Sequence, residues 1–270
     1  MKSLFLIGYF VITAFCTKAQ TLTGVVIDAK TAKPLPYVNI GIIGKSVGTV
    51  TAENGTYKLD LSNHPADSLR ISMVGYISQA FKIADIDVNA AKTISLQPSL
   101  TQLKEVRVSN HKWKQVILGN TTRSKGTNAG FTSGRLGNEI GAVIKIKKSP
   151  TYLKRFNASL ASEIVVDSIM MRLNFYTVKG GLPDQLLQNQ NIFVTVKKGQ
   201  DLISIDLEPY NIIVEDKFFV SLEWIKQSRS QGIMFSASLF SGAIIARETS
   251  QAKWEKEGIA GLGFNVLAEY

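Results

Sequence analysis

Cysteine and histidine are scarce in this chain of 270 residues, which has one cysteine, Cys16, and two histidines, His64 and His111. A single cysteine cannot form an internal disulfide, so the sequence argues against a disulfide-stapled secreted module. Neither histidine has a second histidine, a cysteine or a carboxylate at the spacing of metal ligands. The sequence therefore indicates no catalytic residue, no metal site and no cofactor, and we expect a protein that is not an enzyme.

Two weaker chemical signals have simple structural explanations. Paired carboxylates of the glycosidase type meet only in the fold, so sequence alone leaves them open. The segment GKSVGT at residues 44–49 contains glycine and lysine but lacks the spacing of a P-loop, and a turn explains it. The acidic residues considered lie in or beside predicted strands, and we expect each to face solvent: Glu163, Asp167, Glu223 and Glu248.

Long apolar runs are lacking except at the start, where Lys2 precedes the 12-residue run LFLIGYFVITAF. A helix that spans a bilayer needs roughly 20 residues. A charged start, a short apolar stretch and small residues are typical of a secretory signal peptide, which we predict over residues 1–19 with cleavage before Gln20. A membrane anchor and lipidation of Cys16 are the alternatives, although Phe15 fits lipidation poorly. We expect export to the periplasm, the outer membrane or the cell surface.

Positive charge is concentrated in one segment. The formal net charge is +10, and residues 104–155, with 12 basic and 2 acidic residues, carry all of this excess. We expect no nucleic-acid ligand for an exported protein. Anionic lipid or lipopolysaccharide is the better candidate ligand for the predicted basic linker over residues 99–138. A solvated basic face that aids solubility is the simpler interpretation.

Short β-rich segments cut by turn residues fill residues 20–98. Pro34 and Pro36 lack amide donors and interrupt the first two segments, so a bend joins two strands there. Asn54-Gly55 is a strong hairpin signal. Apolar and polar residues then alternate in DSLRISM. About seven strands without a helical period predict a small β-sandwich.

These residues also resemble a known family. The segments GVVIDAKTAKPLPYVNI, GTVTAENGTYKLDL and DSLRISMVGY are similar to the carboxypeptidase-like regulatory domain, from Thr21 to about Pro98. The resemblance implies a transthyretin-like sandwich without peptidase activity, because the family is named after a non-catalytic domain attached to carboxypeptidases. Such domains are common in exported proteins of the Bacteroidetes and often precede TonB-dependent outer-membrane receptors. LKEVRV resembles the segment that joins the domain to the receptor plug, but the chain then departs from that pattern.

The β pattern returns in residues 139–270, where we predict about ten strands. Leu173 and Phe175 alternate with Arg172 and Asn174, which places the apolar side chains on one face. Length and strand number predict a second, jelly-roll-like β-sandwich; a small outer-membrane β-barrel is the alternative. The region looks like the C-terminal domain beside regulatory-like domains in exported Bacteroidetes proteins, a resemblance that implies no particular activity.

The sequence thus predicts an all-β, non-catalytic cell-envelope protein that acts through protein interaction or structure, with an accessory role in TonB-dependent outer-membrane transport as one form. The alternative is a carbohydrate-binding protein of the cell surface, because jelly rolls often bind glycans on aromatic platforms. The candidate ligand-contact aromatics, for each of which core packing is the competing role, are Tyr176, Tyr210, Trp224 and Trp254.

Overall fold

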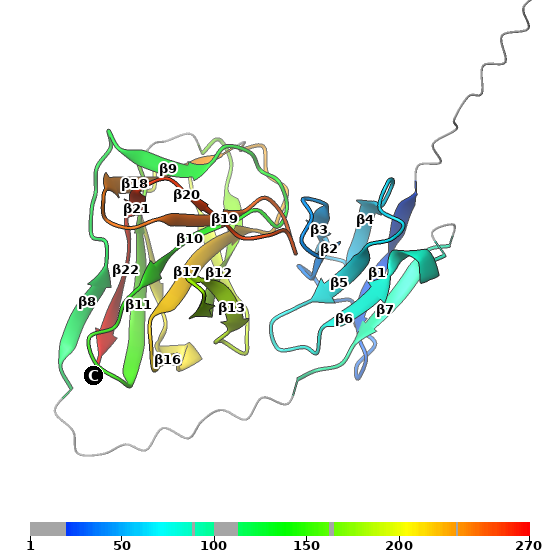
Figure 1. Cartoon of the computed structure of the whole chain (residues 1–270), viewed down its shortest axis with the longest axis horizontal. Coiled ribbons are helices and arrows are strands. Elements are labelled where there is room, and N and C mark those ends of the chain that lie inside the picture. Colours follow the sequence, from blue (N-terminus) through cyan, green and yellow to red (C-terminus); the bar gives the residue numbers. More distant parts are fainter. Residues whose placement is uncertain (1–19, 88–89, 100–112, 162–164, 231) are drawn as a thin grey trace, which may run out of the picture.

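The computed structural model describes residues 20–87, 90–99, 113–161, 165–230 and 232–270. Within them the chain forms 22 strands and two short 3₁₀ turns, so the predicted all-β class is confirmed. Figure 1 shows an N-terminal domain, blue to cyan, beside a second domain, green to red. No helix in the described parts is long and apolar enough to cross a membrane. The predicted signal peptide, Cys16, His111 and Glu163 lie outside the described residues.

The N-terminal domain is a β-sandwich of seven strands. One sheet has the order β4-β1-β7, with β1 and β7 parallel, and the other has the order β3-β2-β5-β6. Alternate side chains, such as Tyr57 and Leu59 on one strand and Leu69 and Ile71 on another, are buried in a common core. The strands are β1 (Thr21–Asp28), β2 (Asn39–Ile42), β3 (Gly48–Val50), β4 (Thr56–Asp60), β5 (Ser68–Ser72), β6 (Gln79–Lys82) and β7 (Lys92–Leu96).

A turn lies at Asn54-Gly55 as expected, but the predicted hairpin is wrong, because the two strands that the turn joins, β3 and β4, belong to different sheets and pair with β2 and β1. Gly55 has φ +75°, a conformation that glycine adopts without steric cost. The Oδ1 atom of Asn54 accepts hydrogen bonds from the backbone and the hydroxyl of Thr56, at 3.2 and 2.6 Å. The turn leads directly into β4, which pairs with β1 in the other sheet.

The second domain contains fifteen strands, counted over the described residues, in three sheets. A seven-stranded sheet has the order β13-β12-β17-β10-β19-β20, with β14 also paired to β12. A five-stranded sheet has the order β15-β11-β22-β8, with β16 also paired to β11, and a small sheet has the order β21-β18-β9. The strands are β8 (Gln115–Gly119), β9 (Asn128–Phe131), β10 (Glu139–Ile144), β11 (Thr151–Ser159), β12 (Ile169–Lys179), β13 (Leu182–Leu186), β14 (Ile192–Val196), β15 (Leu202–Asp206), β16 (Ile213–Val214), β17 (Phe218–Trp224), β18 (Ile233–Leu239), β19 (Ile244–Arg247), β20 (Glu255–Glu257), β21 (Ala260–Leu262) and β22 (Phe264–Glu269).

Part of the predicted linker belongs to the second domain. Residues 99–138 were expected to connect the domains, but β8 pairs with β22 and β9 pairs with β18. Leu118 and Phe131 are buried in the second core and hold these strands in place. The correction has a physical cause: burial of a few apolar side chains outweighs the loop-forming composition around them.

Both faces of the central strands β12 and β17 are buried, which the alternation did not predict. Leu173 and Phe175 point into the apolar core, as expected, and are fully buried. Arg172 and Asn174, on the opposite face, are buried too, at 0% and 1% exposure. Glu223 was expected to face solvent and is instead fully buried. The opposite face therefore has its own cover, and its polar residues require partners.

Candidate functional site

A row of four charged side chains crosses the seven-stranded sheet. Arg172 on β12 lies opposite Glu223 on β17, Glu223 lies opposite Glu139 on β10, and Glu139 lies opposite Arg247 on β19. Cross-strand neighbours on one face are close enough for direct contact. We call these four residues the charge row; two cations flank two carboxylates, so their formal charges cancel.

The charge row is held by direct ion pairs. The Nε atom of Arg172 lies 3.0 Å from Oε2 of Glu223, and Nη2 of Arg247 lies 2.5 Å from Oε2 of Glu139. The side chains of Arg172 and both glutamates are 0% exposed, and that of Arg247 is 9% exposed. Breaking a buried pair leaves an uncompensated charge, so each member depends on its partner.

Neighbouring polar side chains hydrogen-bond the two carboxylates. Asn174 donates from Nδ2 to Glu139 at 2.9 Å and to Glu223 at 3.0 Å. The hydroxyls of Tyr176 and Ser221 donate to Oε1 of Glu139 at 3.0 and 2.5 Å. One oxygen of each carboxylate thus accepts several hydrogen bonds, while Oε2 of Glu139 and Oε1 of Glu223 are buried without a hydrogen-bond partner among the described residues and face the guanidinium of Arg247. Both carboxylates are covered, an arrangement that suits a structural role better than attack on a substrate.

The charges in the row shift one another's pKa values. Burial alone would raise the pKa of Glu223, but the positive charges of Arg172 and Arg247 outweigh burial and hold it below the ordinary carboxyl value of 4.5. Burial alone would lower the pKa of Arg247, whereas the charge of Glu139 keeps it above its ordinary range. Burial and the nearby Glu139 raise the pKa of Tyr176. Glu223 and Arg247 are thus ionised at neutral pH.

The N-terminal domain completes the hydrogen bonding of Arg172. Its Nη1 atom donates to the carbonyl of Tyr37 at 3.0 Å and to Oδ1 of Asn191 at 3.0 Å, and Nη2 donates to Oδ1 of Asn39 at 2.8 Å. Tyr37 and Asn39 belong to the N-terminal domain. This domain is therefore the cover over the end of the polar sheet face that carries Arg172.

Close backbone packing fixes the two domains further. Gly41 on β2 lies against the backbone of Ser250, where an added Cβ atom would be 2.1 Å from the carbonyl oxygen. The side chain of Gln251 donates to the hydroxyl of Ser72 at 2.8 Å. Lys226 and Glu53 form an exposed ion pair between the domains at 2.6 Å. The junction is thus a specific contact with both buried and exposed parts.

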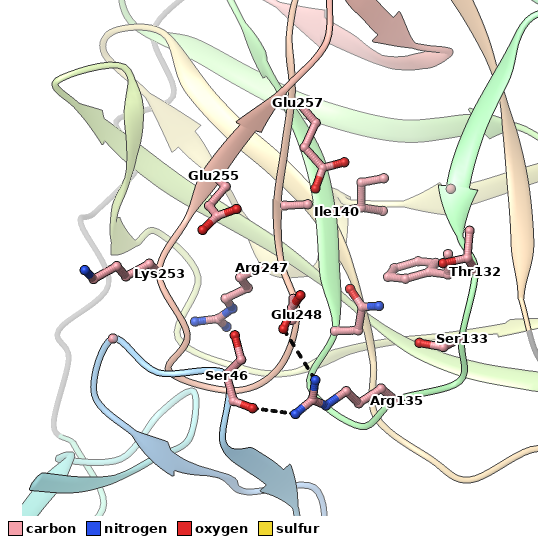
Figure 2. Close-up of a pocket in the computed structure, with 15 residues that line it drawn as sticks. Ser46, Thr132, Ser133, Arg135, Ile140, Arg247, Glu248, Lys253, Glu255 and Glu257 are labelled. Carbon is pink, nitrogen blue, oxygen red and sulfur yellow. Dashed lines mark hydrogen bonds and ion pairs between the residues drawn. The ribbon is translucent and has the colours of Figure 1, made fainter. Parts of the chain in front are cut away.

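A polar cleft opens beside the charge row at the junction (Figure 2). This junction cleft has a volume of about 370 Å³. Arg135 donates to the carbonyl of Ser46 in the N-terminal domain and lies 3.5 Å from Glu248, while Glu255 and Glu257 occupy the opposite side. The remaining lining includes Thr132, Ser133, Asn138, Arg247 and Lys253. Carboxylates, guanidinium groups and hydroxyls therefore face one space.

Arg247 connects the junction cleft to the charge row. Its guanidinium lies over the ring of Trp254, 4.6 Å from the ring centroid, a cation–π contact. Its Nε atom is buried and has no hydrogen-bond partner within the described parts of the chain. A buried donor left unpaired costs free energy.

Of the four aromatic residues predicted to contact ligand, the structure brings together Tyr176 and Trp254, which pack edge-on with 5.9 Å between ring centroids. Trp224 is fully buried and donates from its indole to the carbonyl of Lys226, and Tyr176 is buried against Phe219. Neither ring is open to a glycan. Tyr210 and Trp254 are half-buried, and none of the four lines the junction cleft.

The N-terminal domain contains a serine motif of the kind found at nucleophile elbows. Gly44, Ser46 and Gly48 have the spacing Gly-x-Ser-x-Gly, which the interpretation of residues 44–49 as a simple turn passed over. The structure places this segment in the tight turn between β2 and β3, not in the strand-to-helix turn of a nucleophile elbow. The Nδ1 atom of His64 lies 2.8 Å from Asp67, yet no hydrogen bond joins Ser46 to His64 among the described residues. Ser46 and His64 line one pocket without a hydrogen bond between them, so within the described residues the serine is not paired with this histidine.

Sequence reasoning missed the charge row and the junction cleft. One signal was available: Arg172 and Glu223 sit in strands, IMMRLNFYTV and FFVSLEW, that are apolar on both sides of the polar residue. Such strands are typical of burial on both faces. The described residues contain no group of three or more histidine, cysteine or acidic side chains that could hold a metal ion.

The family comparison agrees with the N-terminal fold. Residues 22–108 match the family model of the CarboxypepD_reg-like domain, which covers only this part of the chain. The match covers the β-sandwich described above, while all four residues of the charge row lie in the second domain. No curated protein shows a significant match to the chain.

Solved structures give only distant similarities. The cysteine protease and lectin-like domains of Cwp84, a surface-layer-associated protein of Clostridium difficile, share 8% identity at a TM-score of 0.41, over 87% of this chain and 58% of that one. The chain thus spans less than two thirds of that structure. A proposed carbohydrate-binding protein from Bacteroides uniformis shares 10% identity at a TM-score of 0.26, over 90% of this chain and 98% of that one. Similarity at this level assigns neither ligand nor activity.

Proposed function

We propose that the protein is a non-catalytic, exported cell-envelope protein that binds another protein by strand addition at β8. The observation that carries this proposal is the unprotected edge of β8. This strand pairs with β22 on one side, and none of the described strands pairs with its other edge. It lies on the side of the second domain away from the N-terminal domain (Figure 1).

The side chains of β8 make its edge suitable for a partner strand. The strand QVILG contains no charged residue, no proline and no bulge, which are the usual devices that prevent edge-to-edge pairing. Ile117 is 57% exposed. Trp113, just before the strand, packs edge-on against Tyr152 with 4.8 Å between ring centroids. A partner strand would gain backbone hydrogen bonds from the edge and apolar contact from Ile117.

The fixed junction supports an interaction role rather than a catalytic one. The buried carboxylates Glu139 and Glu223 are committed to the contacts that hold the sheet and the N-terminal domain. A fixed pair of domains presents a constant surface, which lowers the entropy lost when a partner binds. An outer-membrane TonB-dependent transporter is the partner class that the N-terminal family suggests.

Site-specific photo-crosslinking in intact cells tests the proposal. A photoreactive amino acid replaces Ile117 in one variant and Ile77 of the N-terminal domain in the matched control, since both side chains are 57% exposed. We expect an adduct with an envelope protein from position 117 and a much weaker one from position 77. Adducts equally abundant at both positions, or adducts only with a second copy of this chain, contradict the proposal.

Carbohydrate binding in the junction cleft is the second candidate function. The cleft combines carboxylates, a guanidinium and hydroxyls, which are the groups that bind sugar hydroxyls, and cavities between domains are common ligand sites. A glycan array followed by titration calorimetry tests this candidate. Binding should weaken at least tenfold in Glu257→Gln or Thr132→Ala and remain unchanged in Glu208→Gln, which lies outside the cleft. An array without hits removes this candidate.

A further inference from the structure

A second cleft in the second domain combines an apolar floor with basic side chains. It has a volume of about 740 Å³, and its floor includes Val143, Val178 and Ile245. Three lysines also line it, and among the described residues that form its walls there is no aspartate or glutamate. We call it the lysine cleft; its lysines are Lys145, Lys217 and Lys256.

Strand register brings these lysines together. Ile144 on β10 pairs with Phe218 on β17, so Lys145 and Lys217 adjoin this pair at the same end of the sheet. Lys256 on β20 pairs with Ile245 on β19. Its ammonium lies over Gly181, where an added Cβ atom would be 2.8 Å from Nζ. Because no carboxylate in the cleft balances them, the lysines favour an anionic ligand.

An exposed apolar tip adjoins the lysine cleft. Leu239, Phe240 and Ile259 are 59%, 82% and 58% exposed, and we call them the apolar tip. Phe240 has φ +59°, a left-handed conformation that is unfavourable for a residue with a Cβ atom. Its N–H donates to the carbonyl of Ile259 at 2.8 Å, which fixes the tip. The next two residues, Ser241 and Gly242, line the cleft.

We propose that this end of the second domain binds the surface of an anionic lipid bilayer. The rings and alkyl groups of the apolar tip enter the interfacial layer, where aromatic side chains are favoured. The three lysines contact the phosphates of the lipid head groups. The charge complementarity of the cleft selects an anionic membrane over a neutral apolar surface. This membrane contact goes beyond the proposed function and does not use Ile117, although Gly119 at the end of β8 lines the cleft.

The site differs from the basic linker that the sequence suggested. Two of the basic residues in the predicted linker are engaged in the structure: Lys125 lies 2.9 Å from Asp201, and Arg135 lies 3.5 Å from Glu248. Such pairing reduces the charge that they offer to a membrane. The lysine cleft instead presents its charge next to apolar side chains, and stable membrane attachment requires two such signals.

Vesicle co-sedimentation tests the proposal. The protein is mixed with vesicles of phosphatidylethanolamine and phosphatidylglycerol, or with vesicles of neutral phosphatidylcholine. We expect binding to the anionic vesicles that weakens with added salt, because salt screens exposed charges. Lys217→Gln should weaken binding about fivefold, and Phe240→Ser about tenfold. The matched controls Lys58→Gln and Ile77→Ser, on exposed positions of the N-terminal domain, should bind like the wild type.

Three outcomes overturn the proposal: equal binding to neutral and anionic vesicles, no pelleting with either, or Lys217→Gln and Phe240→Ser variants that bind like the wild type. Circular dichroism of each variant verifies folding. The crosslinking result at Ile117 is a separate readout, because Phe240→Ser should weaken vesicle binding about tenfold and changes no residue of β8. A protein adduct at Ile117 without vesicle binding therefore rejects only the membrane contact.

Discussion

Replacing Arg172 with methionine should destabilise the protein and loosen the contact between its domains. The substitution removes hydrogen bonds from the guanidinium to Glu223, to Asn191 and to the two N-terminal residues Tyr37 and Asn39, all at 2.8 to 3.0 Å. Methionine keeps a long, flexible side chain, so the cavity left behind is small. The main effect is therefore electrostatic: the carboxylate of Glu223 stays buried without its closest cation.

The structure gives the expected magnitude. Removing one partner of a fully buried ion pair costs about 3–5 kcal/mol, and both side chains here are 0% exposed. A folded protein is stable by only about 5–15 kcal/mol, so this loss is a large fraction of the total. For a chain of this size, each kcal/mol lowers the melting temperature by roughly 2–4 °C. We therefore expect the melting temperature to fall by roughly 6–20 °C.

Urea unfolding, followed by tryptophan fluorescence and circular dichroism, measures the loss. Lys226→Met is the matched control, because it breaks the ion pair with Glu53 across the same junction. The side chains of Lys226 and Glu53 are 47% and 65% exposed. Exposed pairs contribute little, so this control should change stability slightly. The double variant Arg172→Met with Glu223→Leu should recover part of the loss, because an apolar pair can replace a buried ion pair.

The reasoning fails if Arg172→Met is no more destabilising than Lys226→Met. It also fails if the double variant is less stable than the single variant, because the loss would then come from packing. The number of transitions is a second readout. In the wild type the two domains should unfold together, whereas in Arg172→Met the N-terminal domain should unfold first.

Three further predictions follow from particular residues. The ionised form of Glu223 stabilises the fold above its unfolded pKa of about 4.5, and this stabilisation is lost as the pH falls through the lower pKa of the folded state. Urea titrations should therefore show a smaller difference in unfolding free energy between the wild type and Arg172→Met at pH 3 than at pH 7. Gly41→Ala should cost about 1–3 kcal/mol by overpacking, because the new Cβ would lie 2.1 Å from the carbonyl of Ser250, whereas Gly126→Ala, with no atom within 4 Å, should be neutral in thermal unfolding. Phe240→Gly should preserve or raise the melting temperature, because it relieves a left-handed conformation that costs about 1 kcal/mol or more; a clear loss of stability would show that the ring packs in the fold.

Alternation in the sequence was sufficient to predict the strands and their apolar faces. Leu173 and Phe175 are buried as expected, and the Asn54-Gly55 turn has the conformation that its residues favour. These features depend on neighbours a few residues away. A period of two and a positive-φ turn are both local properties, so they can be read without knowing what else the chain packs against.

The burial of Arg172 could not be predicted in the same way. Alternation assigns a side chain to a face but does not say what covers that face. Here the cover is the N-terminal domain, which supplies Asn39, 133 residues away in the sequence. Strand β8 was missed for a related reason, because its place is decided by pairing with β22 near the end of the chain. Long-range contacts of this kind leave only weak local signals.

The bond between Arg172 and Asn39 restricts how the N-terminal domain can be exchanged. Domains of this family look modular in sequence, and a chimaera that carries a different family member at residues 20–98 appears simple to build. Such a graft would have to present a carbonyl oxygen and an amide oxygen where Tyr37 and Asn39 now meet the guanidinium. A transplanted domain that lacked them would leave the guanidinium of Arg172 without these two acceptors and would not dock on the second domain.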